Sequence, residues 1–372
     1  MKIAIDLRSL SSGSISGVEN YTLNLLDNLL KLDKTNQYTL FYNSFFNKQL
    51  GDFHYVNSKV IHSRLPNKVL NIGLKLKALK LEQLAGDFDL LFMPNLNQYH
   101  ISNSAKLVIT THDLSPVLTP EFYDVKRRMW HKFLNYKRAF ARANILFAVS
   151  EYTKNDLIKV FNIAPEKIKV IYPGLDHNIF NPSVMEEDQR NLRNRYGLPG
   201  DFYLFLSTIE PRKNLKTLIR AFEQVNNSVH LVIAGRLGWK YKKDFALIKK
   251  SKKNAKIKYI GYISESDKPA LIKMAKALVY PSFYEGFGFQ PLEAFASGTP
   301  VIASHVTSLP EVVSGAGLLI NPYSVDDLSF ALTEIVANKA LRASLIEKGL
   351  LQAKKFTWVK TAEEVLNNFK LL

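Results

Sequence analysis

Two acidic side chains in the stretch PSFYEGFGFQPLEAFASGTPVIAS, residues 281–304, have types and a spacing that suit chemistry. Glu285 and Glu293 are separated by seven residues, which include two glycines that let the backbone approach a ligand closely. A helix is expected to begin near Gln290 and Pro291, because proline is tolerated in a first helical turn. The free amides of that turn attract phosphate, and carboxylates accept hydrogen bonds from sugar hydroxyls. The stretch therefore predicts a site for a phosphorylated sugar; the alternative is an ordinary helix start whose acid is favoured by the helix dipole.

Two basic residues follow an apolar run, FYLFLST at 202–208, that has the length of a strand. Arg212 and Lys213 lie in EPRKN, between the end of that strand and a helix expected from Asn214. Cations at a helix start cost the helix roughly 0.3–1 kcal/mol each. Their presence there favours a role in neutralising a diphosphate, and the alternative is a solvated surface pair.

A histidine and an aspartate come directly after another expected strand, in VITTHDLSP. His112 at a strand's carboxyl end suits the orientation of a hydroxyl or acid–base work, with Asp113 beside it. A buried structural histidine is the alternative. The other histidines show no close-set pattern of ligands around this position, so a metal ion is not expected.

The loop GSISG, residues 13–17, lies between the first expected strand and a helix. Gly13 and Gly17 do not have the spacing of the dinucleotide fingerprint, and no acidic residue follows at the distance that fingerprint requires. NAD binding is therefore disfavoured. The loop is expected either to cover an acceptor or phosphate, or to be a plain tight turn.

These residues must be positioned by the elements around them, and apolar runs of strand length alternate with helical patterns along the whole chain. Strands are expected at 2–7, 38–42, 59–62, 90–93, 107–111, 145–149, 168–171, 202–208, 229–235, 256–263, 277–282, 300–304 and 317–320. The longest helices expected in the first half are 18–32, 67–84, 121–142 and 151–161, the last with Ser150 as its N-cap. This alternation predicts an α/β fold with mostly parallel sheets.

A domain boundary is expected in YPGLDHNIFNP, residues 172–182, because two prolines and a glycine interrupt the periodicity there. The chain length also favours two domains over one. The first is expected to span 1–174 and the second 175–355. Since ligands bind at the carboxyl ends of strands in open α/β sheets, the site is expected to be shared between them.

Composition narrows the function classes. The chain has 372 residues, 47% of them hydrophobic, which is typical of a folded globular protein. It contains no cysteine, so disulfides and thiolate metal sites are excluded. It opens MKIAIDL without a basic and apolar leader, and no apolar run approaches the length of a membrane span. A cytoplasmic protein is expected, either free or peripheral at the inner face of the membrane.

The formal net charge of +17 requires an explanation by a partner or by solvent. Residues 121–142 mix basic with apolar and aromatic side chains, and residues 67–81 mix basic with apolar ones, which suits a helix on an anionic membrane surface. Packing on the protein's own core is the alternative for both. The lysine-rich segment 240–258 is best interpreted as a solvated helix and loop. No nucleic-acid-binding signature accompanies the charge, so nucleic acid is not expected as a partner.

Taken in order, these motifs resemble the retaining GT-B glycosyltransferases of the family 4 type. The markers are the glycine loop at 13–17, HDLSP, VSEYTKND, YPGLD, EPRKN, AGRLGW and the acid pair in EGFGFQPLEAFASGTPVI. The resemblance runs almost from end to end, and it implies two Rossmann-like doubly wound domains that face a central cleft. It also implies that the last helix, in residues 356–372, crosses back onto the first domain. HDLSP and TIEPRKN look most like bacterial mannosyltransferases of surface polysaccharide or lipopolysaccharide synthesis.

The resemblance also implies roles for individual residues. Lys213 with Arg212 would bind the donor diphosphate, Glu293 the nucleotide ribose, and Glu285 the donor sugar and phosphate. His112 would contact the sugar from the other domain. Further donor-binding positions implied by the family motifs are Gly286, Phe287, Gly288, Phe289, Gly235 and Arg236, and the acceptor or phosphate loop would involve Gly13, Gly17 and Asp113.

The reaction implied by the resemblance is hexosyl transfer from a nucleotide sugar to a saccharide or lipid-linked acceptor, with retention of configuration and without a metal ion or cofactor. GDP-mannose is the favoured donor. The same chemistry with a UDP-sugar is one alternative, and a GT-B-shaped sugar-nucleotide 2-epimerase, acting on the donor alone, is another. A nonenzymatic module that binds sugar nucleotides or anionic membranes is the third.

Overall fold

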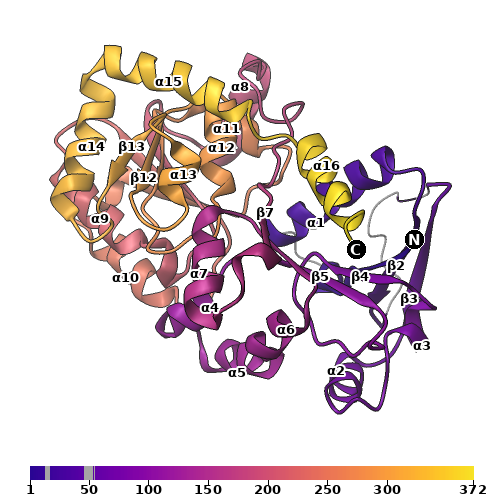
Figure 1. Cartoon of the computed structure of the whole chain (residues 1–372). Helices are drawn as coiled ribbons and strands as arrows, with labels where there is room; N and C mark the ends of the chain where they lie inside the picture. Colours follow the sequence, from indigo (N-terminus) through magenta and orange to yellow (C-terminus); the bar gives the residue numbers. More distant parts are fainter. Residues whose placement is uncertain (13–16, 46–52, 54) are drawn as a thin grey trace. The chain divides into compact units, whose positions relative to one another are not determined.

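The computed structural model describes the chain except for residues 13–16, 46–52 and 54 (Figure 1). The chain divides into two compact units, each built around a parallel sheet. The first unit comprises Met1–Leu114, Lys126–Gly174 and Trp358–Leu372, and the second comprises Ser115–Val125 and Leu175–Thr357. Residues 115–125, which we predicted within the first domain, thus pack with the second unit.

The sheet of the first unit has seven strands, each parallel to its neighbours. They are β1 (Lys2–Asp6), β2 (Gln37–Asn43), β3 (Ser58–Ser63), β4 (Leu90–Met93), β5 (Lys106–Thr111), β6 (Ile145–Ala148) and β7 (Ile168–Val170). Their order in space is β3-β2-β1-β4-β5-β6-β7, so the direction of winding reverses between β1 and β4. Ligands bind doubly wound sheets at the carboxyl ends of the strands beside such a reversal.

Helices surround this sheet, and the first and last of them pack against each other although they come from opposite ends of the chain (Figure 1). They are α1 (Gly17–Leu32), α2 (Asn67–Lys75), α3 (Glu82–Ala85), α5 (Val125–Leu134), α6 (Tyr136–Arg142), α7 (Glu151–Phe161) and α16 (Trp358–Phe369), with the 3-10 turns η1 (Arg8–Ser12) and η3 (Pro165–Lys167). Ser150 is confirmed as the N-cap of α7, since its side chain accepts a hydrogen bond from the Thr153 amide.

The sheet of the second unit has six parallel strands. They are β8 (Phe202–Leu206), β9 (His230–Ala234), β10 (Ile257–Gly261), β11 (Ala277–Tyr280), β12 (Val301–Ser304) and β13 (Leu318–Ile320). Their order is β10-β9-β8-β11-β12-β13, which reverses between β8 and β11. Both predicted Rossmann-like sheets are therefore confirmed.

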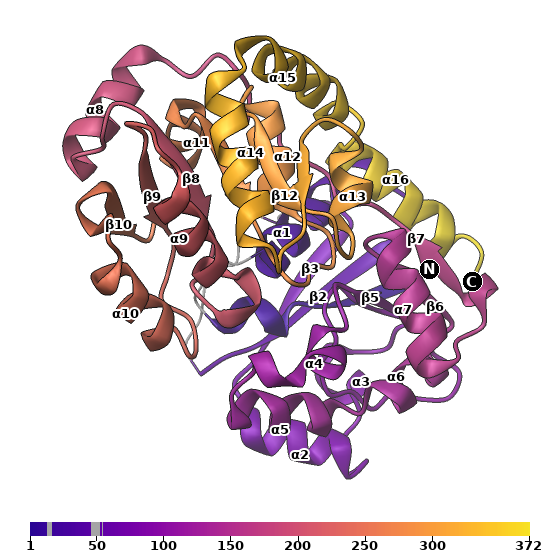
Figure 2. The same ribbon diagram turned by 90° about the vertical axis from the view of Figure 1, so that its left-hand side faces the viewer.

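The second unit contains the remaining helices. They are α4 (Ser115–Leu118), α8 (Glu186–Tyr196), α9 (Leu215–Gln224), α10 (Lys242–Lys250), α11 (Lys268–Met274), α12 (Phe289–Ala296), α13 (Leu309–Val313), α14 (Val325–Ala337) and α15 (Lys339–Ala353), with the 3-10 turns η2 (Pro120–Phe122), η4 (Pro211–Lys213) and η5 (Asn254–Lys256). Figure 2 shows α9 and α14 side by side over the sheet, where their apolar faces join one core with β8, β9 and β11.

The structure corrects two of the predicted helices. Residues 67–84 form α2 and α3, and the turn between them contains Lys77 with a positive φ of 62°. Residues 121–142 form the end of η2 followed by α5 and α6, and the break is at Asn135, whose φ is 51°. Asparagine tolerates this left-handed conformation, and here its side chain caps α6 by accepting a hydrogen bond from the Arg138 amide. The apolar and basic pattern continues across both breaks and therefore does not reveal them.

Aromatic contacts hold the segment 115–125 against the second unit. Phe122 stacks on Phe283 with their ring centroids 5.7 Å apart, and Tyr123 stacks on Trp239 at 5.5 Å. The indole Nε1 of Trp239 donates a hydrogen bond to the carbonyl of Phe122 at 2.6 Å. Such contacts join residues that are far apart in the sequence. The position of this segment in the chain therefore did not predict that it packs with the second unit.

Candidate functional site

The acidic and basic residues selected from the sequence follow the two strands beside the reversal of the second sheet. Arg212 and Lys213 lie in η4, which follows β8, and Glu285 lies in the loop that follows β11. Asn214 joins its own loop to two others: its side-chain amide donates to the carbonyl of Pro281, which follows β11, at 2.9 Å and to that of Pro322, which follows β13, at 2.8 Å. The same residue caps α9, so one side chain fixes both the helix start and the distance between the loops.

The two cations contact the acid directly. The ammonium Nζ of Lys213 lies 2.6 Å from Oε1 of Glu285, and Nη1 of Arg212 lies 3.0 Å from Oε2 of the same carboxylate. Arg212 also pairs with Glu210 through Nη2 at 2.9 Å. Lys213 in addition donates to the phenol oxygen of Tyr280, the last residue of β11, at 3.1 Å. The cluster is buried, with exposed fractions of 2% for Glu210 and 6% for Glu285.

Burial and the neighbouring charges act in opposite directions on this cluster. Burial raises the pKa of Glu285, but the charges of Lys213 and Arg212 outweigh it and bring the pKa to about 2. Burial and the charge of Arg212 lower the pKa of Lys213, and the two carboxylates oppose them only in part. Burial raises the pKa of Glu210 above its ordinary value, against the attraction of both cations. Glu285 is therefore ionised at neutral pH.

The loop after β11 is held by hydrogen bonds to its backbone. The hydroxyl of Ser308 lies 3.0 Å from the carbonyl of Glu285 and 2.8 Å from that of Phe287. The Glu285 amide donates to Oγ1 of Thr307 at 3.1 Å, and Nη1 of Arg212 donates to the Tyr284 carbonyl at 2.6 Å. These bonds fix the backbone that leads into α12, so a ligand would meet a loop already ordered.

The helix α12 begins at Phe289, one residue before the predicted start. Its N-cap is Gly288, with a φ of 112°, a conformation that glycine adopts without a steric cost. Gly286 and Phe287 lie in the loop just before it, and the rings of Phe287 and Phe289 meet edge to face at 5.5 Å. As a glycine, the N-cap Gly288 has no side chain of its own with which to cap the first turn.

Glu293 lies within α12 and belongs to a second ion pair. Its Oε1 lies 3.2 Å from Nζ of Lys268, which also pairs with Glu265 at 2.8 Å. Within the part of the chain that the structure describes, its other carboxylate oxygen is buried and has no hydrogen-bond partner. Burial raises the pKa of Glu293, and the charge of Lys268 only partly offsets this. A buried acceptor without a donor is costly, and a ligand hydroxyl would satisfy it.

His112 and Asp113 lie in the first unit, directly after β5. Nε2 of His112 is 2.8 Å from the carbonyl of Pro94, so this nitrogen carries the proton and donates it. The imidazole also meets the ring of Tyr21 edge to face at 4.8 Å. Burial lowers the pKa of His112, against the carbonyl of Pro94 and the charges of Asp113 and Glu19, so the ring is neutral at pH 7.

The remaining predicted positions lie at turns. Gly235 follows β9 with a φ of 140°, and a Cβ there would lie 1.8 Å from the carbonyl oxygen of Ser207, which explains its glycine structurally. Arg236 is exposed and lies over the ring of Tyr262, 4.1 Å from its centroid. Gly17 is the first residue of α1. The predicted loop residue Gly13 lies outside the described residues.

Sequence reasoning missed several residues that support this site. Tyr280, Lys268, Ser308 and Asn214 each contact it, yet only Asn214, next to the cation pair, carried a local signal, that of a helix cap. At the carboxyl edge of the first sheet, five buried polar atoms have no partner in the described part of the chain: Arg8 Nη1, Ser9 Oγ, Asn43 Oδ1, Asn97 Nδ2 and Thr111 Oγ1. None of these was selected, because their environment is set by distant strands.

Two kinds of feature are absent from the part of the chain that the structure describes. No group of three or more His, Asp or Glu side chains is arranged to hold a metal ion. No helix combines the length and the apolar character needed to span a bilayer.

Comparison with known proteins matches nearly the whole chain in two parts. Residues 15–179 match the family model Glycosyltransferase Family 4, and residues 188–352 match the model Glycosyl transferases group 1. The cation and carboxylate cluster lies within the second of these matches.

Individual relatives agree with the family models. The O-antigen chain mannosyltransferase B of Escherichia coli is 28% identical, over 96% of this chain and 97% of its own. A serotype-specific mannosyltransferase WbdA of Escherichia coli is 29% identical over 72% of this chain, which matches only 34% of WbdA. Among solved structures, HepE of Anabaena in complex with UDP and glucose covers both chains fully, with a TM-score of 0.76 and 21% identity.

Proposed function

Because the chain belongs to the family 4 glycosyltransferases and has the GT-B fold, we propose that it transfers mannose from GDP-mannose, with retention of configuration, to a saccharide acceptor of bacterial surface polysaccharide or lipopolysaccharide synthesis. The observation that carries this proposal is the buried contact of Arg212 and Lys213 with Glu285 at the reversal of the second sheet. This is where open α/β sheets bind nucleotides. The mannosyltransferase named above, similar over its full length, supports the choice of sugar.

The cations would act on the leaving group. Transfer breaks the bond between the anomeric carbon and the diphosphate oxygen, and negative charge develops on that oxygen. Lys213 and Arg212 are held in place by Glu285 and by the Tyr284 carbonyl before any ligand arrives. Fixed donors in a site that excludes water stabilise such charge without reorganising, which is commonly worth about 100-fold to 1000-fold in rate.

Two further groups would orient the donor. The buried carboxylate oxygen of Glu293 that lacks a partner in the described chain is suited to accept from a ribose hydroxyl, while Lys268 holds the other oxygen. The amides of Phe289 and its neighbours at the start of α12 would meet the phosphate. The loop backbone of Gly286, Phe287 and Gly288 would lie along the sugar. The donor site would also include Gly235 and Arg236.

On the acceptor side, the neutral His112 would orient a sugar hydroxyl. The acceptor oxygen then forms a bond to the anomeric carbon on the face that the leaving group departs from, and its proton passes to the departing phosphate oxygen. This route gives retention without a protein nucleophile or a metal ion. Gly17 and Asp113 would act on the acceptor.

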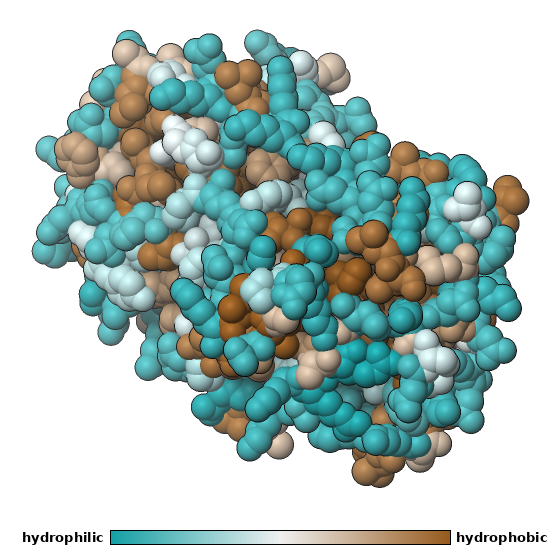
Figure 3. Space-filling view, viewed as in Figure 1, coloured by the Kyte–Doolittle hydropathy of each residue, from teal (hydrophilic) through white to brown (hydrophobic). Residues whose placement is uncertain are grey.

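A peripheral position at an anionic membrane surface on the cytoplasmic side completes the proposal. Val69, Ile72 and Leu76, in α2 and at its end, have exposed fractions of 59%, 52% and 73%. Figure 3 shows hydrophobic atoms at the lower edge of the molecule, where Figure 1 places α2. Lysines surround these side chains in the sequence, and apolar groups beside basic ones suit an anionic bilayer.

The test combines binding with product analysis. A panel of nucleotide sugars is screened for protection against thermal unfolding, because a ligand that binds only the native protein raises its apparent stability. GDP-mannose should protect, and nuclear magnetic resonance of the product made with an acceptor should show the α-configuration of the donor retained. Protection by a UDP-sugar and not by GDP-mannose would refute the donor. Product formed without acceptor would indicate an epimerase, and an inverted anomeric centre would refute retention.

A further inference from the structure

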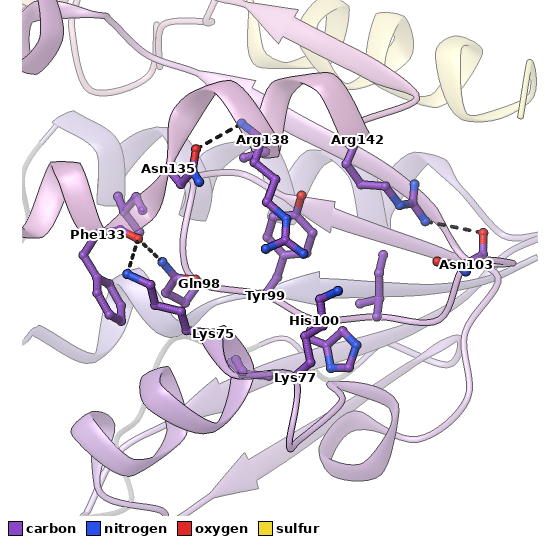
Figure 4. Close-up of a pocket in the computed structure, with 14 residues that line it drawn as sticks. Lys75, Lys77, Gln98, Tyr99, His100, Asn103, Phe133, Asn135, Arg138 and Arg142 are labelled. Carbon is purple, nitrogen blue, oxygen red and sulfur yellow. Dashed lines mark hydrogen bonds between the residues drawn. The ribbon is translucent and has the colours of Figure 1, made fainter.

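A cavity lies wholly within the first unit, and none of the residues discussed as the donor site lines it. It has a volume of about 200 Å³ and lies between the end of α2, the chain that follows β4, and α6 (Figure 4). Four of its lining residues are cationic: Lys75, Lys77, Arg138 and Arg142. Its described lining contains no Asp or Glu.

The four cations differ in how they are held. Nζ of Lys75 lies 3.7 Å from the centroid of the Phe133 ring and 3.4 Å from its carbonyl oxygen, and Nη2 of Arg142 donates to the carbonyl of Ala105 at 2.7 Å. The side chains of Lys77 and Arg138, in contrast, make no hydrogen bond or ion pair with any described residue.

Tyr99 lines the same cavity as the two arginines, and their charges act on its phenol. Burial raises the pKa of its phenol to about 12, while the charges of Arg142 and Arg138 oppose the rise. Figure 4 shows Arg138 beside this ring, whereas the Arg142 guanidinium is directed toward Asn103. Like charges gathered in one cavity repel each other, and an anion between them would relieve that repulsion.

We propose that this cavity binds a phosphate group, independently of the nucleotide-sugar site in the second unit. The planar guanidinium of Arg138 presents a fork of donors that matches phosphate oxygens, and Lys77 adds a mobile point charge. The apolar side chains of Leu74 and Leu134 form another part of the wall, so the site suits a phosphate attached to an organic group. That group is either part of a lipid head or part of a phosphorylated saccharide.

The experiment compares inorganic pyrophosphate binding in four full-length proteins by titration calorimetry. The cavity variant carries Lys77→Gln and Arg138→Gln, and both side chains are exposed, so the fold should be kept. Its matched control is Lys137→Gln, an exposed lysine of α6 that does not line the cavity. Lys213→Met identifies the binding event that belongs to the donor site.

We expect the cavity variant to lose, by tenfold or more in affinity, a binding event that Lys137→Gln and Lys213→Met both retain. Equal binding by the cavity variant and the Lys137→Gln control would overturn the site. Co-sedimentation with vesicles then identifies the source of the phosphate. Loss of binding to phosphatidylglycerol vesicles in the cavity variant, with phosphatidylcholine vesicles as the zwitterionic reference of zero net charge, indicates a lipid head group. Unchanged vesicle binding together with lost pyrophosphate binding indicates a soluble phosphorylated ligand.

Discussion

Replacement of Lys213 with methionine should remove most of the transfer activity and leave a folded protein. Methionine keeps the length and the apolar stem of lysine and deletes the charge. Lys213 is 8% exposed, and its Nζ lies 2.6 Å from Glu285. The variant therefore breaks one of the two contacts that compensate the buried carboxylate, and Arg212, at 3.0 Å, keeps the other.

The magnitude follows from these contacts. Removing one partner of a buried ion pair costs about 3–5 kcal/mol when the remaining charge is left alone. Because Arg212 still compensates Glu285, we expect a loss of about 2–3 kcal/mol in the free energy of unfolding. The decrease in kcat is expected to correspond to a larger free energy than this decrease in the free energy of unfolding. A fixed donor to a developing oxyanion is commonly worth about 100-fold to 1000-fold in kcat.

Two assays separate these effects. Urea denaturation gives the free energy of unfolding, and transfer of a radiolabelled sugar from the donor that the panel identifies gives kcat and KM. The matched control is Lys216→Met, on the exposed side of α9, which should change unfolding by less than about 0.5 kcal/mol and leave kcat as it is. A folded Lys213→Met protein with kcat within threefold of the original would refute the role of this cation in the leaving-group step.

Three further outcomes are expected. Glu293→Gln keeps the shape of α12 but weakens the acceptor for ribose, so nucleoside diphosphate affinity measured by calorimetry should fall about tenfold; an unchanged affinity would contradict this role. The pKa of Glu285 is about 2 against an ordinary 4.5, so its contribution to stability is complete above about pH 4.5 and is lost as the pH falls through 2. Between pH 6 and pH 2 the free energy of unfolding of the original protein should therefore fall by about 3 kcal/mol more than that of Glu285→Gln. Urea titrations at each pH would measure this difference. Donor binding should take up a proton at Glu210, which calorimetry in buffers of different ionisation enthalpy detects, and Glu210→Gln should abolish that uptake.

The strands were predictable because of where they lie. Strands covered on both faces become continuous apolar runs, and β8 and β11 are buried at every residue. The placement of Lys213 and Glu285 after two strands of one sheet follows from the same reasoning, since a doubly wound sheet brings the carboxyl ends of its central strands to one edge. Their direct ion pair was not predicted. The sequence thus predicts which edge of the sheet carries the site and which residues lie at that edge.

Features that depend on a single backbone angle or on a distant partner were not predictable in this way. The break at Asn135 requires one residue with a φ of 51°, and the pattern of side chains on either side of it is the same. Lys268 comes from α11 and becomes part of the site only because Glu293 lies opposite it. Likewise, residues 115–125 follow a strand of the first unit, yet their aromatic rings stack on rings of the second unit.

The charges of the donor cluster impose a condition on any ligand. Arg212 and Lys213 face Glu210 and Glu285, so the four side chains together are neutral when all are ionised. A diphosphate would add negative charge to a buried group that has no surplus of positive charge, which is unfavourable at low dielectric. Glu210 resolves this, because burial already raises its pKa and a nearby phosphate would raise it further. Protonation of Glu210 would leave one net positive charge beside the phosphate, whereas Glu285, with its pKa near 2, would stay ionised and keep Lys213 in place. The two carboxylates would thus have different roles: Glu285 holds the cations in position, and Glu210 takes up a proton when the donor binds.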